Sequence, residues 1–427
     1  MLYEMWQQTV QSRPDEVAWR DLASKSEFTF RQINQQADQQ SPLERGSLLP
    51  ISTQAGALEL VIQTLRAWRD GAVLCPYESQ CPQLETLVGL PDGIAHVKST
   101  SGSTGKARFV LFQEEQLLAD ARNIASTMGF EAPHPNLAVI SVAHSYGFSH
   151  LILPLLLLGK PVWLVDKPLP EAMRVAFASA TPLFLPAVPA MWRAWHQCGL
   201  LKGAPIHLAM SAGAPLPLEL EKQVYEETGL KIHNFYGASE CGGIAYDRTE
   251  RPRGRATLVG TPLDGVTLRV DASGHMVVNG ENVGFGYWPN IEPDDSLGVN
   301  QFTLSDLVEI STEGVDLIGR RTDAINVAGR KVSPSEIECA LLTHPAVRHC
   351  VVFGVPSGDS ARVEDIVACV NAGGDIGITE IGEHLTGRLQ GWQIPRRWLF
   401  TESLEPNERG KISRAHWRTF FLNEPDA

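Results

Sequence analysis

The chain has 427 residues, of which 43% are hydrophobic and 20% charged, an ordinary balance for a globular protein with a sizeable core. Its net charge of −13 repels nucleic acid and anionic membranes, so we expect neither as a partner. The apolar run at residues 151–158 is too short for a membrane span, and the N-terminus does not resemble a secretory signal. Seven scattered cysteines indicate reduced thiols rather than a zinc site, and together these features predict a cytoplasmic location.

Helical and strand patterns alternate along the first half of the chain. Residues 55–75 show apolar residues at helical spacing and then a strand pattern, and residues 114–128 are again helical. A buried strand is predicted at 137–142, followed by a helix at 151–158 and a strand at 162–165. This alternation is typical of parallel sheets covered by helices, which places the chain in the α/β class.

The pattern changes in the second half of the chain. Two pairs of short strands around turn residues, at 266–278 and 308–318, predict a small antiparallel β unit. Beyond residue 320, helices at 335–342 and 380–389 alternate with strands at 351–353 and 366–370. We therefore expect a large N-terminal domain at residues 1–321 and a small α+β C-terminal domain at residues 322–427.

The sharpest local signal is the loop Ser99–Arg108, which is rich in Ser, Thr and Gly and carries two basic residues. Small residues allow the backbone to fold closely around phosphate oxygens, and N–H and hydroxyl groups donate hydrogen bonds to them. It is not a Walker loop, because only two residues separate Gly102 from Gly105 and Ala107 follows the lysine. On this loop alone, a flexible surface segment is an equally good interpretation.

Six further motifs follow the loop in the sequence, and they decide how the loop is interpreted. In chain order they are Ser211–Leu216, Asn234–Glu240, Ser305–Leu307, Gly319–Arg320, Ile325–Glu338 and Arg409–Arg414. Together with the loop they resemble the adenylate-forming superfamily of acyl-CoA synthetases, nonribosomal-peptide adenylation domains and luciferases, from about residue 3 to residue 414. The resemblance implies that ATP and Mg²⁺ activate a fatty or aryl carboxylic acid as an acyl-adenylate. The acyl group then passes to the thiol of CoA or of the phosphopantetheine arm of an acyl carrier protein.

The resemblance also implies a role for individual residues. Lys411, Glu240 and Thr104 would be catalytic, and Glu240 would hold Mg²⁺, which prefers carboxylate oxygen. ATP and AMP would be bound by Thr100, Ser101, Gly102, Ser103, Thr104, Gly105, Gly213, Ala214, Pro215, Asn234, Tyr236, Gly237, Ser239, Asp306 and Arg320. By the same resemblance the C-terminal domain rotates between the two steps, so that Lys411 withdraws and the loop with Gly329 and Arg330 approaches for thiol transfer.

The acyl group would lie in a pocket lined by His144, Ala187 and Gly242. The segment Ala143–Phe148 resembles that of acyl-carrier-protein and fatty-acyl synthetases, although His144 also fits a satisfied core histidine. Gly242 and Gly243 fit either an open space for an acyl or aryl tail or a backbone turn.

Several positions depart from the family pattern. The phosphate loop continues with Ala107 and Arg108 in place of Pro and Lys, Ser305 precedes the ribose aspartate, and the hinge position holds Thr322. The loop also begins early in the chain, so part of the first subdomain is trimmed and the acceptor remains open. A carrier protein is acidic and would need a basic patch, for which Arg388, Arg396, Arg397 and Arg414 are candidates unless they form a solvated surface.

Other functions remain to be weighed against this hypothesis. An amino-acid-activating enzyme usually has an acidic residue near Phe235, and Asn234 supplies none. A non-catalytic nucleotide- or acyl-binding relative would not need to keep Glu240 and Lys411. The sequence has no Gly-x-Ser-x-Gly elbow, which a serine hydrolase would need. It also lacks the glycine fingerprint of a dinucleotide-binding dehydrogenase, so both functions are disfavoured.

Overall fold

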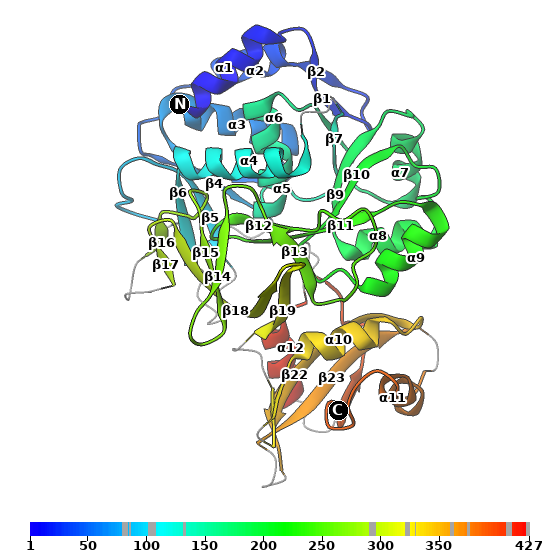
Figure 1. Cartoon of the computed structure of the whole chain (residues 1–427). Coiled ribbons are helices and arrows are strands. Elements are labelled where there is room, and N and C mark those ends of the chain that lie inside the picture. Colours follow the sequence, from blue (N-terminus) through cyan, green and yellow to red (C-terminus); the bar gives the residue numbers. More distant parts are fainter. Residues whose placement is uncertain are drawn as a thin grey trace.

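The computed structural model describes residues 1–78, 84, 87–100, 108–130, 134–289, 296–320, 325–328, 330–358, 363–373, 376–406 and 412–423, without the side chains of Thr100, Arg320 and Lys331. A large part contains the elements up to β19, and a smaller part below it in Figure 1 contains the last three helices. Within the described residues, no helix is long and apolar enough to cross a membrane.

The main sheet of the large part has 14 strands and consists of a mostly parallel half and an antiparallel half. The parallel half has the order β11-β10-β9-β7-β8-β1, with β2 antiparallel at its edge. Its strands are β1 (Val17–Asp21), β2 (Glu27–Thr29), β7 (Asn136–Ala138), β8 (Val162–Leu164), β9 (Leu183–Ala187), β10 (Ile206–Ser211) and β11 (Ile232–Ala238). The parallel sheet predicted from the alternating pattern is thereby confirmed.

The antiparallel half continues from β11 without a break in the hydrogen bonding. Its strands are β12 (Gly242–Tyr246), β13 (Leu258–Pro262), β14 (Thr267–Val270), β15 (His275–Asn279), β17 (Leu297–Gly298), β18 (Gln301–Ser311) and β19 (Gly314–Arg320). Both predicted hairpins are present as β14–β15 and β18–β19. The small β unit is therefore an extension of the main sheet, and this brings β18 into the same hydrogen-bonded lattice as β10 and β11.

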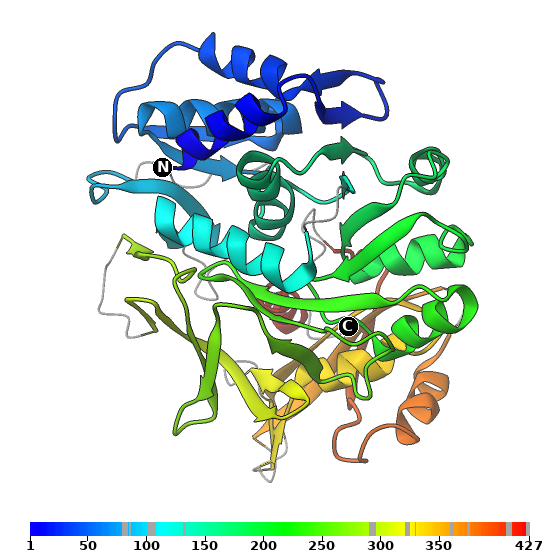
Figure 2. The ribbon, with the colours of Figure 1, turned by 45° about the horizontal axis from the view of Figure 1, so that its top comes forward.

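A second sheet has five strands in the order β16-β6-β5-β4-β3. These are β3 (Leu48–Ser52), β4 (Val73–Tyr77), β5 (Ile94–Thr100), β6 (Arg108–Gln113) and β16 (Gly286–Trp288). The side chains of β6 alternate into a cluster that contains Phe109 and Leu111 and another that contains Val110 and Phe112, so the central strands are covered on both faces. Figure 2 shows helix α4 lying alongside these strands and the main sheet.

The helices of the large part pack against both sheets. They are α1 (Leu2–Ser12), α2 (Phe30–Asp38), the 3₁₀ turn η1 (Thr53–Ala55), α3 (Ala57–Asp70), α4 (Glu114–Met128), α5 (Ser145–Gly147), the π-helical turn η3 (Phe148–Ile152), α6 (Leu153–Leu158), α7 (Pro170–Phe177), α8 (Pro189–Gln197) and α9 (Leu218–Thr228). Helix α4 has the bounds that the sequence predicts, because Gln113 and Gln116 form a capping box and Gly129 ends it in a left-handed conformation. The strand predicted at 137–142 is shorter, since β7 pairs with β8 over only three residues before the chain turns toward the cleft described below.

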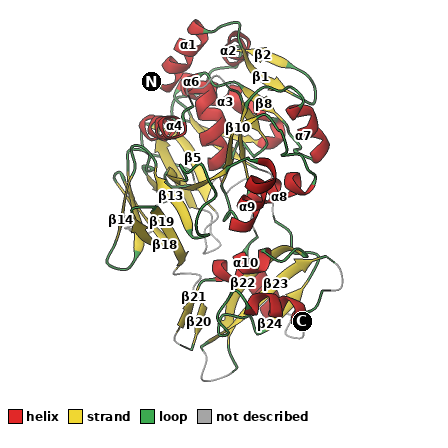
Figure 3. Cartoon of the chain, turned by 45° about the vertical axis from the view of Figure 1, so that its right-hand side comes forward, coloured by secondary structure: helices red, strands yellow, loops and turns green. Residues whose placement is uncertain are grey.

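The small part is an α+β unit, as Figure 3 shows, and buried apolar side chains give it its own core. Its elements are β20 (Ile325–Val327), β21 (Arg330–Val332), α10 (Pro334–Leu342), β22 (Val347–Pro356), β23 (Glu364–Ala372), α11 (Ile378–Thr386), β24 (Arg397–Phe400) and α12 (Arg414–Asn423). Strands β22, β23 and β24 form a three-stranded sheet, and β20 and β21 form a separate hairpin. The predicted boundary at 321/322 falls between β19 and β20, outside the described residues, and stays a prediction.

Candidate active site

A cleft of about 2120 Å³ lies between the large part and the small part. Of the residues that the sequence singles out, the cleft is lined by His144, Gly213, Ala214, Pro215, Asn234, Tyr236, Gly237, Ser239, Glu240, Gly242 and Asp306. Residues 101–105, Gly329 and Lys411 lie outside the described residues, as do the side chains of Thr100 and Arg320. Ala187 is fully buried at the end of β9 and is not among the lining residues, whereas the next three residues, 188–190, are.

One wall of the cleft brings together three segments that are far apart in sequence. The small residues Gly213–Pro215 follow β10, Tyr236 lies on the neighbouring strand β11, and Asp306 lies on β18. The Tyr236 hydroxyl donates to Asp306 Oδ2 at 2.9 Å, so a flat aromatic ring and a largely buried carboxylate are held side by side. Asp306 is also in register with Arg320 on β19. This wall offers a ring for stacking and a carboxylate that accepts hydrogen bonds from hydroxyl groups.

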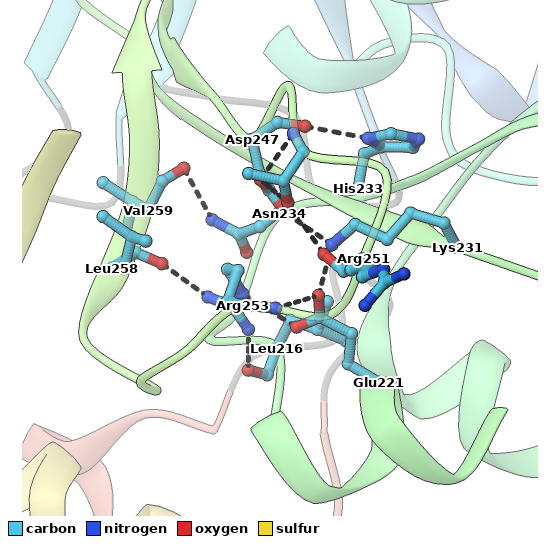
Figure 4. A network of polar contacts seen from close by, with 11 residues as sticks. Leu216, Glu221, Lys231, His233, Asn234, Asp247, Arg251, Arg253, Leu258 and Val259 are labelled. Carbon is cyan, nitrogen blue, oxygen red and sulfur yellow. Dashed lines mark hydrogen bonds and ion pairs between the residues drawn. The ribbon is translucent and has the colours of Figure 1, made fainter. Parts of the chain in front are cut away.

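A buried ionic network fastens the loop that contains Gly213–Pro215 (Figure 4). The Arg253 guanidinium donates to the carbonyl oxygens of Leu216 at 2.8 Å and Leu258 at 2.7 Å, and to Glu221 Oε2 at 2.8 Å. Lys231 forms ion pairs with both Glu221 and Asp247. Two cations thus balance two anions, and the balance is needed because unpaired buried charges are costly. Arg253 ties the loop after β10 to β13.

Glu240 occupies the turn between β11 and β12 and has an aromatic neighbour that the sequence analysis missed. The Tyr287 hydroxyl donates to Glu240 Oε1 at 3.2 Å, and the Arg108 guanidinium carbon lies 3.8 Å from the centre of the Tyr287 ring. Burial raises the pKa of Tyr287, so the phenol stays protonated and keeps donating. The unusual Arg108 therefore stacks on the ring that orients Glu240. A partly exposed carboxylate in a cleft suits a hard cation such as Mg²⁺, which commonly combines one or two protein carboxylates with phosphate oxygens.

A second set of buried polar groups lies beneath the cleft, between β5 and α4. Lys98 is only 5% exposed, donates to Ser145 Oγ at 3.2 Å, and lies 4.3 Å from the centre of the Phe112 ring. Burial lowers the pKa of Lys98, and the nearby charges of Asp120 and Glu240 oppose this shift. Asp120 accepts from Ser149 Oγ at 2.5 Å and from the Gly243 amide at 2.9 Å. No local pattern distinguished Asp120 from a solvated residue of an amphipathic helix.

The carboxylate of Asp120 explains the two glycines at the start of β12. Gly242 has a φ of +64°, and a Cβ atom there would lie 2.2 Å from Asp120 Oδ1. A Cβ atom on Gly243 would lie 2.5 Å from the Leu263 side chain. Of the two alternatives that the sequence left open, the structure favours a turn and close packing for these glycines, although both still line the cleft.

Aromatic rings line the cleft at this end. Tyr146 stacks against Phe235 with ring centres 6.1 Å apart, and His150 meets Phe235 edge-on at 4.5 Å. His144 stands at the start of α5, where its Nδ1 accepts from the Tyr146 amide at 3.4 Å. Tyr146, Ser149, His150 and Phe235 all line the cleft. Flat aromatic rings therefore form much of the wall at this end.

The small part closes the other side of the cleft. Arg193 on α8 donates to the carbonyl oxygens of Val347 at 3.4 Å and Leu342 at 3.5 Å. Pro406 and Ile412, the described residues on either side of 407–411, both line the cleft. Arg330 instead lies on the β20–β21 hairpin, where its guanidinium carbon is 5.1 Å from the Trp392 ring centre. In this arrangement both residues that flank 407–411 lie at the cleft, whereas no described residue of the β20–β21 hairpin lines it.

The chain is similar to proteins of known family, both in sequence and in fold. A family model described as AMP-binding enzyme matches residues 58–288, and one described as AMP-binding enzyme C-terminal domain matches residues 336–411. A 2-succinylbenzoate–CoA ligase of Staphylococcus epidermidis is 27% identical over 341 residues, which are 78% of this chain and 71% of the relative. A feruloyl-CoA synthase of Amycolatopsis is 27% identical over the same shares of the two chains. The structure of an o-succinylbenzoate coenzyme A synthetase from Bacillus subtilis, solved with ATP and magnesium, matches with a TM-score of 0.86 at 19% identity, covering 97% of this chain and 99% of that one.

Proposed function

The chain belongs to the AMP-binding enzyme family, and on this premise we propose how its cleft performs the reaction and which residues take part. It is an AMP-forming acid–thiol ligase that uses ATP and Mg²⁺ to convert a carboxylic acid to an acyl-adenylate and passes the acyl group to a thiol. The observation that carries the proposal for the site is the convergence of Gly213–Pro215, Tyr236, Glu240 and Asp306 on one cleft.

In the first step, a carboxylate oxygen of the acid attacks the α-phosphorus of ATP, and pyrophosphate leaves. Tyr236 would stack on the adenine ring against the small residues Gly213–Pro215, and Asp306 would accept hydrogen bonds from the ribose hydroxyls, supported by Arg320. Glu240, oriented by Tyr287, would hold Mg²⁺, which neutralises charge on the phosphates. Catalysis in such a transfer consists mainly of positioning and charge stabilisation.

We assign the remaining phosphate contacts to segments outside the described residues. Thr100–Gly105 would surround the β- and γ-phosphates, with Thr104 as a catalytic hydroxyl, and Asn234, Gly237 and Ser239 would complete the nucleotide site. Lys411 would place its ammonium at the α-phosphate, in keeping with the position of Pro406 and Ile412 at the cleft.

In the second step, a thiolate sulfur attacks the carbonyl carbon of the acyl-adenylate, and AMP leaves. We propose that the small part first rotates, so that Lys411 withdraws and Gly329 and Arg330 approach the cleft. CoA is the acceptor that the names of the relatives support, since these are CoA ligases and a CoA synthase. A carrier protein is the second candidate, but Arg414 is bound to Glu338 at 2.8 Å and Arg397 lies over the Phe421 ring, which leaves less basic surface for docking.

The acid would enter between His144 and Gly242, with its tail against Tyr146, Phe235 and His150. Aryl acids fit this flat-walled end better than long, flexible fatty acids. The amino-acid-activating alternative is disfavoured, because the ammonium group would need an acidic partner and the side chain of Asn234 donates to the Val259 carbonyl at 3.2 Å.

The proposal is tested by measuring pyrophosphate release from ATP and Mg²⁺ with aryl, fatty and amino acids, for the whole chain and for Lys411→Ala. We expect release that depends on one class of acid and falls at least 100-fold in the variant. Thioester formation with CoA, and with a phosphopantetheinylated carrier protein, then identifies the acceptor. Retained release in Lys411→Ala would contradict the role of this lysine, and ATP binding without release for any acid would contradict the activity.

A further inference from the structure

One polar atom at the acyl end of the cleft has no partner among the described residues. It is Nε2 of His150, a side chain that is fully buried and yet lines the cleft. Buried polar atoms are nearly always hydrogen-bonded, so such an atom needs an explanation. The other ring nitrogen, Nδ1, lies 3.1 Å from the carbonyl oxygen of Tyr146.

The contact to Tyr146 fixes the chemical character of the unpartnered atom. A carbonyl oxygen can only accept, so Nδ1 must carry the hydrogen and donate it. Burial lowers the pKa of His150 to about 4, so the imidazole is neutral near pH 7. A neutral imidazole with its hydrogen on Nδ1 leaves Nε2 as an acceptor.

Three polar side chains close to His150 in the sequence or the fold, those of Asn136, Tyr146 and Ser149, already donate to other acceptors. The Tyr146 hydroxyl donates to the Met210 carbonyl at 3.4 Å, and the Ser149 hydroxyl donates to Asp120. The side-chain amide of Asn136 donates to the backbone carbonyl of His150, which holds this turn in place. An unpaired hydrogen-bond acceptor therefore lies at the acyl end of the cleft, on a buried lining residue among flat aromatic rings.

Building on the proposed function, we propose that His150 is a specificity-determining residue that selects carboxylic acids carrying a hydroxyl group at the end remote from the reacting carboxylate. A hydroxyl donates to Nε2 and satisfies it, whereas an acid with an apolar end leaves this buried acceptor unpaired. An acid with a second carboxylate is disfavoured, because its oxygens are acceptors and Asp120 already places a negative charge behind Ser149. The flat walls formed by Tyr146 and Phe235 favour hydroxylated aromatic acids within this class.

The test uses acids in matched pairs that differ by one hydroxyl, with pyrophosphate release as the readout. Suitable pairs are benzoate and 4-hydroxybenzoate, cinnamate and 4-hydroxycinnamate, and hexanoate and 6-hydroxyhexanoate. For at least one pair we expect the unmodified enzyme to favour the hydroxylated acid at least tenfold in kcat/KM. His150→Phe keeps the ring but removes the acceptor, so it should bring this ratio close to one, mainly through the hydroxylated acid.

A second variant separates recognition from a general effect on the pocket. Tyr146→Phe removes a hydroxyl from the same wall, but one that already donates to a carbonyl, so we expect it to retain the ratio. A ratio near one for every pair in the unmodified enzyme, or an unchanged ratio in His150→Phe, overturns the inference while leaving the ligase activity in place. Absence of release with every acid overturns the proposed function, and the inference falls with it.

Discussion

The buried network around Arg253 allows a perturbation with a calculable cost. Arg253→Met keeps an apolar stem of similar length but removes a guanidinium that is 1% exposed. It leaves Glu221 and Asp247 with Lys231 as the remaining cation and deprives two carbonyl oxygens of their donor. Removing one partner of a buried ion pair costs about 3–5 kcal/mol. That is a large share of the roughly 5–15 kcal/mol by which proteins are stable.

Urea denaturation followed by tryptophan fluorescence measures this cost. The matched control is Arg251→Met, because Arg251 lies two residues from Arg253 (Figure 4) and its side chain is exposed, so its replacement should change the free energy of unfolding by less than about 0.5 kcal/mol. A second variant, Arg253→Met with Glu221→Gln, removes one charge of each sign and should recover part of the loss. A cost below about 1 kcal/mol for Arg253→Met, or no recovery in the double variant, would refute the idea that charge balance holds the loop after β10.

Four further predictions concern the cleft. Asp306→Asn should raise the KM for ATP about 10- to 100-fold in a pyrophosphate-release assay, because a charged acceptor for the ribose is lost; an unchanged KM would place the ribose elsewhere. Tyr287→Phe should raise the Mg²⁺ concentration needed for half-maximal rate several-fold, because Glu240 loses the donor that orients it, and an unchanged requirement would contradict this role. Gly242→Ala should lower the free energy of unfolding by at least about 1 kcal/mol, since the new methyl group meets a buried carboxylate and φ is positive; a neutral result in urea denaturation would oppose this packing. Below pH 6.5 the unfolded chain protonates at His150 while the folded chain does so only near pH 4, so stability should fall as pH drops through this window, by up to about 1.4 kcal/mol per pH unit more than in His150→Phe; equal pH dependence in the two proteins would argue against a buried neutral ring.

The sequence predicted those parts of the fold that depend on local periodicity. Helix α4 has the predicted bounds, and both hairpins of the antiparallel half lie where turn residues interrupt alternating strands. The resemblance to a family predicted, in addition, residues that the structure brings together at the cleft, such as Tyr236 and Asp306. Their contact joins positions 70 residues apart, and no local pattern encodes it.

The residues that escaped prediction share a physical reason. Each is a polar side chain whose importance comes from burial by segments distant in sequence. Arg253 lies in a loop rich in proline, glycine and arginine, which is typical of solvated surface, yet it is almost fully enclosed. Asp120 lies on a helix and Tyr287 on a three-residue strand, and both matter through partners more than 25 residues away. His150 lies beside an apolar run and fits a core position until its unpartnered nitrogen is seen.

The contact between Arg193 and the small part has a consequence for how the enzyme would cycle. Both of its acceptors are main-chain carbonyl oxygens, at 3.4 and 3.5 Å, near the upper limit for a hydrogen bond. Hydrogen bonds this long are weak, so Arg193 could exchange them for hydrogen bonds to water at little cost in free energy. The contact uses no side-chain atom of Leu342 or Val347, so substitutions at these two positions keep both acceptors. On the proposed rotation of the small part, the length and charge of the Arg193 side chain on α8 would therefore influence the balance between the two orientations.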